Sequence, residues 1–204
     1  MDMAVWCTIR TYNAHAKELG NDIPNEAIFF TKPENCIHTG NEIPLSTMPD
    51  DVHYETECVL KLNGMGGVSH LMIGLDLTNR SQQELLKAEK LPWARAKCFR
   101  ASALLGSEYE CNVSLDELHL EVHNIGLRLT VNNEIVQQDF LKNMSISPKS
   151  QVEALSEWAP IREGDYLFTG TPKGVGPLAV GDDVKAELFW KDGEVISSFS
   201  ATCV

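Results

Sequence analysis

The chain contains the stretch HYETECVL at residues 53–60, in which two acidic residues, Glu55 and Glu57, stand two positions apart. The apolar flanks indicate a β-strand, and side chains two apart on a strand point to the same face. A second apolar stretch, IGLDLT at residues 73–78, carries Asp76. Carboxylates held side by side repel, so they all stay ionised only where positive charge lies between them. Three carboxylates on two strands therefore fit a hard divalent cation, although two glutamates on a solvent-facing strand edge explain the same spacing.

Strand-forming sequence dominates the rest of the chain. Apolar or alternating runs predict strands at residues 5–9, 27–30, 54–62, 71–77, 118–122, 125–131, 166–168, 183–190 and 195–201. Lys32-Pro33 is expected to end the second of these, and Asn132-Asn133 to turn a hairpin. Short helices are expected at residues 14–19, 81–90 and 152–158. No internal repeat or linker interrupts the pattern, so we expect one domain over residues 1–204 with an α+β, mostly β fold.

Composition narrows the class of protein. With 43% apolar residues the chain is not disordered, and a net charge of −12 argues against binding nucleic acid through a basic face. An acidic protein that handles an anionic substrate needs a local positive centre, such as a metal ion. The six cysteines show no C-x-x-C spacing, which indicates neither a zinc site nor a redox motif. No stretch is long and apolar enough for a membrane span, and the beginning of the chain lacks a secretory signal. We therefore expect a cytoplasmic protein with reduced thiols and neither a nucleic-acid nor a membrane partner.

Two further groups of residues can carry proton chemistry. His15 and Glu18 are three apart on the predicted first helix and so share one face. A carboxylate beside an imidazole raises its basicity, as is needed to take a proton from water. The alternative is an exposed helix with a weak pair. Lys97 lies among apolar residues in WARAKCF (residues 93–99), where burial and a nearby arginine are expected to lower its pKa, although most lysines are simply solvated.

A glycine-rich stretch, TGTPKGVGP at residues 169–177, follows a predicted strand. Glycines and hydroxyl groups let backbone N–H groups approach an anion closely. The stretch fits neither the P-loop nor the dinucleotide-binding pattern, and a tight connection between strands is the alternative explanation. The nucleophile elbow of serine hydrolases and the H-E-x-x-H zinc motif are absent from the sequence.

Taken together, these motifs resemble the fumarylacetoacetate hydrolase family. The order of motifs matches over nearly the whole chain: Arg10-x-Tyr12-x-x-His15-x-x-Glu18, Glu55-x-Glu57, LDLTNR at 75–80, LPWARAK at 91–97 and TGTPKGVGP at 169–177. The sequence is most similar to the small, single-domain branch of that family, whose members are acylpyruvases, oxaloacetate decarboxylases and oxaloacetate tautomerases.

The resemblance implies a rolled β-sheet, a homodimer and Mg²⁺ or Mn²⁺ as cofactor. It implies Glu55, Glu57 and Asp76 as metal ligands, and Lys97 as the acid or base that handles the enol or enolate. The residues implied to contact or orient substrate are Arg10, Arg80, Gln83 and Thr171. His15 and Glu18 would lie in a short N-terminal lid segment and activate water once that lid closes.

The chain also departs from the family pattern. The segment between Glu57 and Asp76 is shorter by roughly one small helix. Thr11 stands where an asparagine is usual, and Arg100 and Leu104 replace residues that are commonly an acid or small polar group and a proline. These changes leave the three carboxylates intact and bear on substrate fit and on the wall of the pocket.

A 2-oxo acid that chelates a divalent cation is activated toward an enolate, from which three outcomes branch. Return of a proton to carbon is tautomerisation, loss of the distal carboxylate is decarboxylation, and water attack on a distal carbonyl is C–C hydrolysis. Because the chain is short and oxaloacetate is small, the favoured hypothesis is an oxaloacetate keto–enol tautomerase and decarboxylase. Hydrolysis of an acylpyruvate is the alternative, supported by His15 and Glu18. Further alternatives are a decarboxylase or isomerase of an aromatic-degradation pathway, a catalytically silent protein that binds metal and a 2-oxo acid, and a purely structural dimer.

Overall fold

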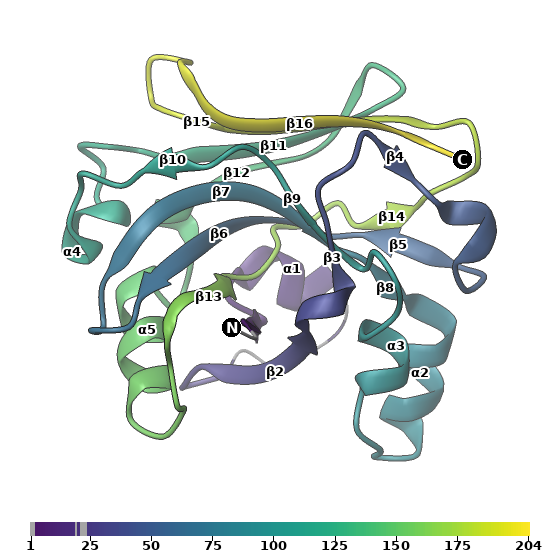
Figure 1. The fold of residues 1–204 in the computed structure, drawn as a ribbon, viewed down its shortest axis with the longest axis horizontal. Helices are drawn as coiled ribbons and strands as arrows, with labels where there is room; N and C mark the ends of the chain where they lie inside the picture. The colour runs from purple at the N-terminus through teal and green to yellow at the C-terminus, as the bar shows by residue number, and fades with distance from the viewer. Residues whose placement is uncertain (1–2, 19, 21–23) are drawn as a thin grey trace.

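The computed structural model describes residues 3–18, 20 and 24–204. Three β-sheets form among these residues, and the largest curls into a roll (Figure 1). In order across that sheet, its strands are β2 (Ile28–Pro33), β1 (Ala4–Ile9), β13 (Glu163–Phe168), β6 (Thr56–Asn63), β7 (Val68–Asp76), β9 (Ala103–Leu105) and β3 (Ile37–His38), with β10 (Tyr109–Glu110) paired to β7. The expected mostly β fold with a rolled sheet is confirmed.

The second sheet forms a layer above the arch of β6 and β7 in Figure 1. Its strands, in order, are β12 (Glu134–Phe140), β11 (Gly126–Val131), β15 (Asp183–Phe189), β16 (Val195–Cys203) and β4 (Glu42–Ile43). A small third sheet joins β14 (Gly176–Pro177), β5 (Val52–Tyr54) and β8 (Thr78–Asn79). It brings the end of the glycine-rich stretch beside the two acidic stretches.

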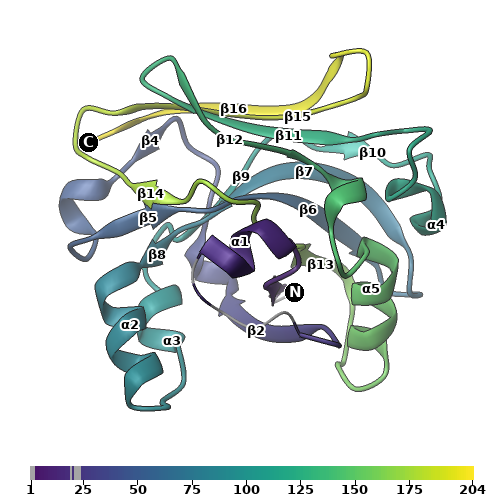
Figure 2. The ribbon, with the colours of Figure 1, turned by 180° about the vertical axis from the view of Figure 1, so that it is seen from behind.

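The helices are short and lie around the open side of the roll. They are α1 (Asn13–Glu18), α2 (Arg80–Ala88), α3 (Ala94–Lys97), α4 (Leu115–Leu118) and α5 (Pro148–Ser156). Figures 1 and 2 both place α1 in the opening, with α2 and α3 on one side of it and α5 on the other. Among the described residues, no helix is long and apolar enough to cross a membrane.

Successive side chains of β6 and β7 point to opposite faces of the sheet, so that one face packs in the main core and the other faces the site. Leu60 and Ile73 belong to the larger apolar cluster, which they form with side chains of the second sheet such as Leu127. Side chains of the opposite parity, such as Val59 and Met72, join a smaller cluster on the inner face of the roll. Glu57 has the parity of Val59, so the strand directs its carboxylate into the roll.

Three expectations about the strands are wrong. β2 continues through Lys32 and Pro33 instead of ending before them; it is the outermost strand of its sheet, where proline is tolerated. Residues 118–122 are not a strand: helix α4, which begins after the capping box between Ser114 and Glu117, ends at Leu118, and a turn follows it. The predicted strand at 54–62 is broken at Glu55, between β5 and β6.

The predicted hairpin is confirmed at β11 and β12. Asn132 and Asn133 connect these strands with φ angles of 50° and 68°. Both angles lie in the left-handed region that a two-residue type I′ turn requires and that asparagine tolerates.

Gly74 on β7 provides a test of packing beside the site. A Cβ there would lie 2.8 Å from the carbonyl oxygen of Leu104 and 2.7 Å from a methyl group of Val59. We expect Gly74→Ala to lower the free energy of unfolding by about 1–3 kcal/mol, because the backbone oxygen cannot move aside cheaply. Urea denaturation measures the change. Thr31→Ala, at an exposed position of β2, is the control and should stay within about 0.5 kcal/mol of the wild type.

Candidate active site

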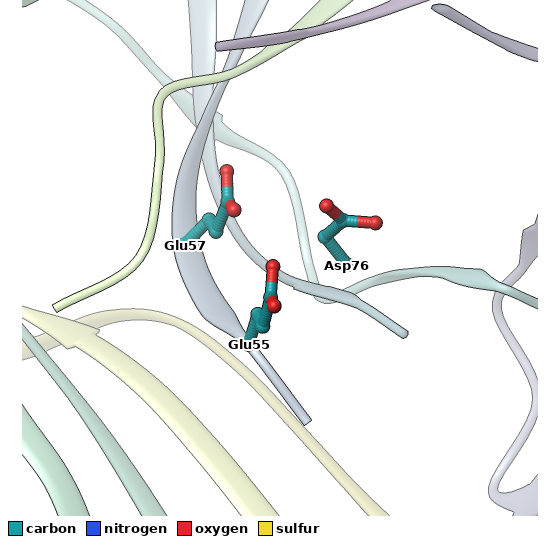
Figure 3. Close-up of side chains that lie close together, drawn as sticks. All are labelled: Glu55, Glu57 and Asp76. Atoms are coloured by element: carbon teal, nitrogen blue, oxygen red, sulfur yellow. The ribbon is translucent and has the colours of Figure 1, made fainter. Parts of the chain in front are cut away.

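Three carboxylates meet on the inner face of the roll. Glu55 lies in the break between β5 and β6, Glu57 on β6, and Asp76 is the last residue of β7. The backbone N–H of Asp76 donates to the carbonyl of Glu55 at 2.9 Å, which holds the two chain segments together. One oxygen of each residue lies within 4.8 Å of the other two, and the side chains lie close together in Figure 3. The three residues are only 6%, 2% and 1% exposed, so the solvent-edge alternative is excluded.

Lys97 lies between two of these carboxylates. Its Nζ donates to Glu55 Oε2 at 2.9 Å, to Asp76 Oδ2 at 2.5 Å and to Thr78 Oγ1 at 2.6 Å. Arg80 pairs with the other oxygen of Glu55 and donates to Gln83 Oε1 at 2.7 Å. Lys97 and Arg80 therefore contact Glu55 directly. Gln83 is connected to Glu55 through Arg80.

Charge and burial oppose each other at this cluster. Burial raises the pKa of Lys97's partner Glu55, but the positive charges of Lys97 and Arg80 outweigh it and hold that pKa well below its usual value. For Lys97 burial lowers the pKa, and the Asp76 and Glu55 carboxylates outweigh it, so the pKa is raised. The expectation of a lowered Lys97 pKa is therefore wrong. Its neighbours in sequence did not reveal the two carboxylates that face it.

The cluster fits a divalent cation. Burial, together with the negative charges of Asp76 and Glu55, raises the pKa of Glu57 well above its usual value, which marks an excess of negative charge. Asp76 Oδ1 is buried without a hydrogen-bond donor, because the Lys32 ammonium at 2.7 Å is outside hydrogen-bond geometry. Three convergent carboxylates form the all-oxygen donor set that Mg²⁺ and Mn²⁺ prefer.

The segment with the histidine–glutamate pair closes over this cluster. His15 Nδ1 lies 3.0 Å from Glu18 Oε2, and the histidine is buried. The Glu18 carboxylate also accepts from the backbone N–H of Gly174, at 3.0 Å to Oε1. The predicted helix at 14–19 is α1, which ends at Glu18; position 19 lies outside the described residues. The alternative of an exposed, weak pair is excluded for His15.

Thr11, one of the departures from the family pattern, connects the chain just before α1 to the glycine-rich loop. Its hydroxyl donates to the carbonyl of Thr169 at 2.7 Å, and its own carbonyl accepts from Ser145 N at 2.7 Å. Gly170 has a φ of +99°, and a Cβ there would lie 2.1 Å from the Thr11 hydroxyl. Only glycine allows the loop to approach Thr11 this closely.

The glycine-rich loop is tied to the acidic strand by backbone and side-chain bonds. Gly170 N donates to Glu57 Oε2 at 2.6 Å. Gln137 on β12, which is buried, donates through Nε2 to Thr171 Oγ1 at 2.9 Å, and its Oε1 accepts from Thr56 N at 2.9 Å. Thr56 stands between the two glutamates, so Gln137 fixes the distance between the acidic strand and Thr171.

A single cavity joins these groups. Its lining residues are Thr8, Ile9, Arg10, His15, Glu55, Glu57, Asp76, Arg80, Gln83, Lys87, Trp93, Lys97 and Thr171. All the residues predicted from the sequence to form the site are in this set except Glu18, which reaches the cavity through His15. Its volume of about 40 Å³ holds roughly three water molecules.

Gln137 and Lys32 are among the residues at this site that escaped sequence analysis. The Lys32 ammonium lies 2.7 Å from Asp76 Oδ1 and donates to the carbonyls of Leu77 and Ser102. The sequence contains a signal for Lys32, which is its position next to the apolar run at residues 27–30. A lysine buried there needs a carboxylate partner, because an unpaired buried charge is costly. No comparable signal marks Gln137.

Lys32 gives the second prediction. Lys32→Met removes a buried cation and leaves Asp76 with one ammonium partner, so we expect unfolding in the presence of chelator to become easier by about 3 kcal/mol. Urea denaturation measures this change. Lys142→Met is the matched control: it removes the cation of an exposed pair with Glu121 and should cost at most about 1 kcal/mol. Equal effects of the two substitutions would contradict the buried ion pair.

Comparison with known proteins bears on identity and location. The chain is 32% identical to an oxaloacetate decarboxylase of Dictyostelium discoideum, over 91% of this chain and 88% of the relative. It is 31% identical to an oxaloacetate tautomerase of Schizosaccharomyces pombe, over 95% and 92% of the two chains. Both relatives are mitochondrial by name, which overturns the expectation of a cytoplasmic protein. That expectation rested on a missing secretory signal, and mitochondrial targeting uses a different pattern.

The solved structures agree in fold. The fumarylpyruvate hydrolase of Pseudomonas aeruginosa, solved in complex with Mn²⁺ and pyruvate, matches 98% of this chain and 89% of its own with a TM-score of 0.82 and 28% identity. The family model for the fumarylacetoacetate hydrolase C-terminal region matches residues 4–200. With the cavity and motifs described above, these matches establish that the chain belongs to the fumarylacetoacetate hydrolase family.

Proposed function

We propose that this chain is a divalent-metal-dependent enzyme that tautomerises and decarboxylates oxaloacetate. The observation that carries the proposal is the buried Glu55–Glu57–Asp76 cluster with the Lys97 ammonium beside it, in one small cavity. The names of the two curated relatives support oxaloacetate as the substrate.

Glu55, Glu57 and Asp76 would hold the cation. Bound there, Mg²⁺ or Mn²⁺ would supply Lewis-acid stabilisation of the negative charge that develops as a 2-oxo acid enolises. Mg²⁺ is the proposed resident ion, and the Mn²⁺ in the related hydrolase supports Mn²⁺ as a substitute.

Lys97 supplies the proton in this mechanism. Its ammonium would deliver a proton to carbon 3 of the enol, and the proton of the enol hydroxyl would return to the Lys97 amine, so that the lysine ends the reaction protonated. Thr171, held by Gln137, and the backbone of the glycine-rich loop would bind the carboxylate next to the 2-oxo group. Arg80 and Gln83, which bond to each other, would orient the substrate.

Acylpyruvate hydrolysis is the second candidate, and one observation favours it. His15 lines the cavity with its imidazole oriented by Glu18, the arrangement needed to take a proton from an attacking water. The related fumarylpyruvate hydrolase is a precedent within the family. Oxaloacetate chemistry does not consume water and does not require this pair.

The decisive experiment follows the ultraviolet absorbance of enol-oxaloacetate and of acetylpyruvate with purified protein and Mg²⁺, with and without chelator. Fast, chelator-sensitive loss of the enol with little acetylpyruvate cleavage supports the proposal. The opposite pattern identifies a hydrolase. Binding of Mg²⁺ and oxalate without turnover of either compound identifies a silent binder. Asp76→Ala should abolish metal dependence and all turnover.

His15→Ala is the third prediction. We expect acetylpyruvate cleavage to fall by about 10²–10⁴-fold, because a general base is lost, while enol-oxaloacetate tautomerisation changes by less than about threefold. Lys17→Ala, at an exposed position of the same helix, is the control and should leave both rates unchanged. Unchanged hydrolysis in the His15 variant would remove the water-activating role.

We also propose that the chain forms a homodimer of single domains. Light scattering coupled to size exclusion tests the mass. A single calorimetric transition tests the domain organisation, and a stable monomer would reject the dimer.

A further inference from the structure

Lys87 lines the cavity without a role in the chemistry described above. It follows Gln83 by one helical turn on α2, so both residues face the same side, and helix side chains lean back toward the N-terminus, here toward Arg80. Its Nζ lies 5.2 Å from the centre of the Trp93 ring. The indole face holds the ammonium beside the cavity by a cation–π contact.

Arg10 is the second cation in this position. It lines the same cavity from the end of β1, and its φ of 59° is a left-handed conformation that a non-glycine residue rarely adopts. Among the described residues, neither Arg10 nor Lys87 has a carboxylate or hydrogen-bond partner for its side chain. Burial, and after it the charge of Arg80, lowers the pKa of Lys87.

Two of the positive side chains at the site, those of Arg10 and Lys87, have no negatively charged partner among the described residues. The cations nearest the carboxylates are already paired: Lys32 with Asp76, Arg80 with Glu55, and Lys97 with both of these carboxylates. Arg10 and Lys87 lie outside these pairs and remain uncompensated. A divalent ion adds further positive charge, so the loaded cavity attracts a dianion more strongly than a monoanion.

We propose that Lys87, together with Arg10, binds the distal carboxylate of a dicarboxylic 2-oxo acid, and so selects dicarboxylates over acylpyruvates with an uncharged acyl end. The inference rests on the proposed function and names the part of the substrate that this pair recognises. Lys87 is a specificity residue in this assignment and takes no part in proton transfer.

The same contact bears on which reaction oxaloacetate undergoes. Decarboxylation breaks the bond between carbons 3 and 4, leaves the electron pair on the enolate and releases the distal carboxylate as neutral CO₂. Tautomerisation only moves a proton between oxygen and carbon, and the distal carboxylate keeps its charge. Cations that bind this carboxylate therefore stabilise the reactant more than the transition state of decarboxylation, and favour tautomerisation.

Binding measurements test the proposal without depending on turnover. The probes are 3,3-difluorooxaloacetate, which has no hydrogen on carbon 3 and cannot enolise, and pyruvate, which lacks the distal carboxylate. By calorimetry with Mn²⁺, Lys87→Met should weaken difluorooxaloacetate binding about tenfold, the size of one lost charged hydrogen bond, and change pyruvate binding less than twofold. Lys87→Arg should restore most of the affinity for the dicarboxylate.

Arg95→Met is the matched control, because it removes a positive charge at an exposed position of the neighbouring helix α3 and should leave both affinities unchanged. An equal loss for both probes in Lys87→Met, an unchanged affinity for both, or a comparable loss in Arg95→Met would overturn the proposal. So would failure of the wild type to bind difluorooxaloacetate more tightly than pyruvate.

Turnover supplies the second readout. The ratio of decarboxylation to tautomerisation of oxaloacetate should rise at least threefold in Lys87→Met, and a fall in that ratio would overturn the assignment. If the Lys87-dependent binding is observed but wild-type protein turns over no oxaloacetate, the proposed function fails while the carboxylate subsite stands.

Discussion

The arrangement of the site depends on the bridge that Lys97 makes between Glu55 and Asp76. Carboxylates buried this deeply are costly unless cations neutralise them, and the cost of removing one partner is larger than the gain of any surface pair. Helix α3 brings Lys97 to the bridge, β2 brings Lys32 and α2 brings Arg80. Two helices and the outermost strand of the roll must therefore be in place before the acidic cluster is tolerated, which couples folding of these elements to assembly of the site.

The sequence was most informative where residues of one chemical type recur at the two-residue repeat of a β-strand. The spacing of Glu55 and Glu57 on an apolar strand predicted a shared face, and Asp76 on the next strand completes the cluster. Sequence patterns were less informative where the partner is remote. Lys32 looked like the end of a strand, because Asp76 is 44 positions away in the chain, and Gln137 bonds to Thr56 across 81 positions. Such contacts are set by how sheets pack, and local propensity carries no information about them.

The pKa of Lys97 illustrates the same limit. Its apolar neighbours in the chain indicated desolvation, which lowers a lysine pKa, and the structure adds two carboxylates that reverse the direction. The alternating pattern at 118–122 likewise failed to predict the structure, because the capping box at Ser114 begins helix α4 just before this stretch and a turn follows the helix. In each case a specific pairing outweighed an average tendency, which is the usual reason that local pattern fails near functional sites.

The Glu18 carboxylate has two partners at once, the His15 imidazole and the backbone N–H of Gly174. The group that orients the histidine is therefore the same group that latches α1 onto the glycine-rich loop. Because His15 and Glu18 lie on the same helix, a movement of α1 that breaks the Glu18–Gly174 bond carries the imidazole and its orienting carboxylate away from the loop together. In the proposed hydrolysis, the imidazole therefore faces the cavity only while the Glu18–Gly174 bond holds, and a substrate still exchanging with bulk solvent is not exposed to activated water.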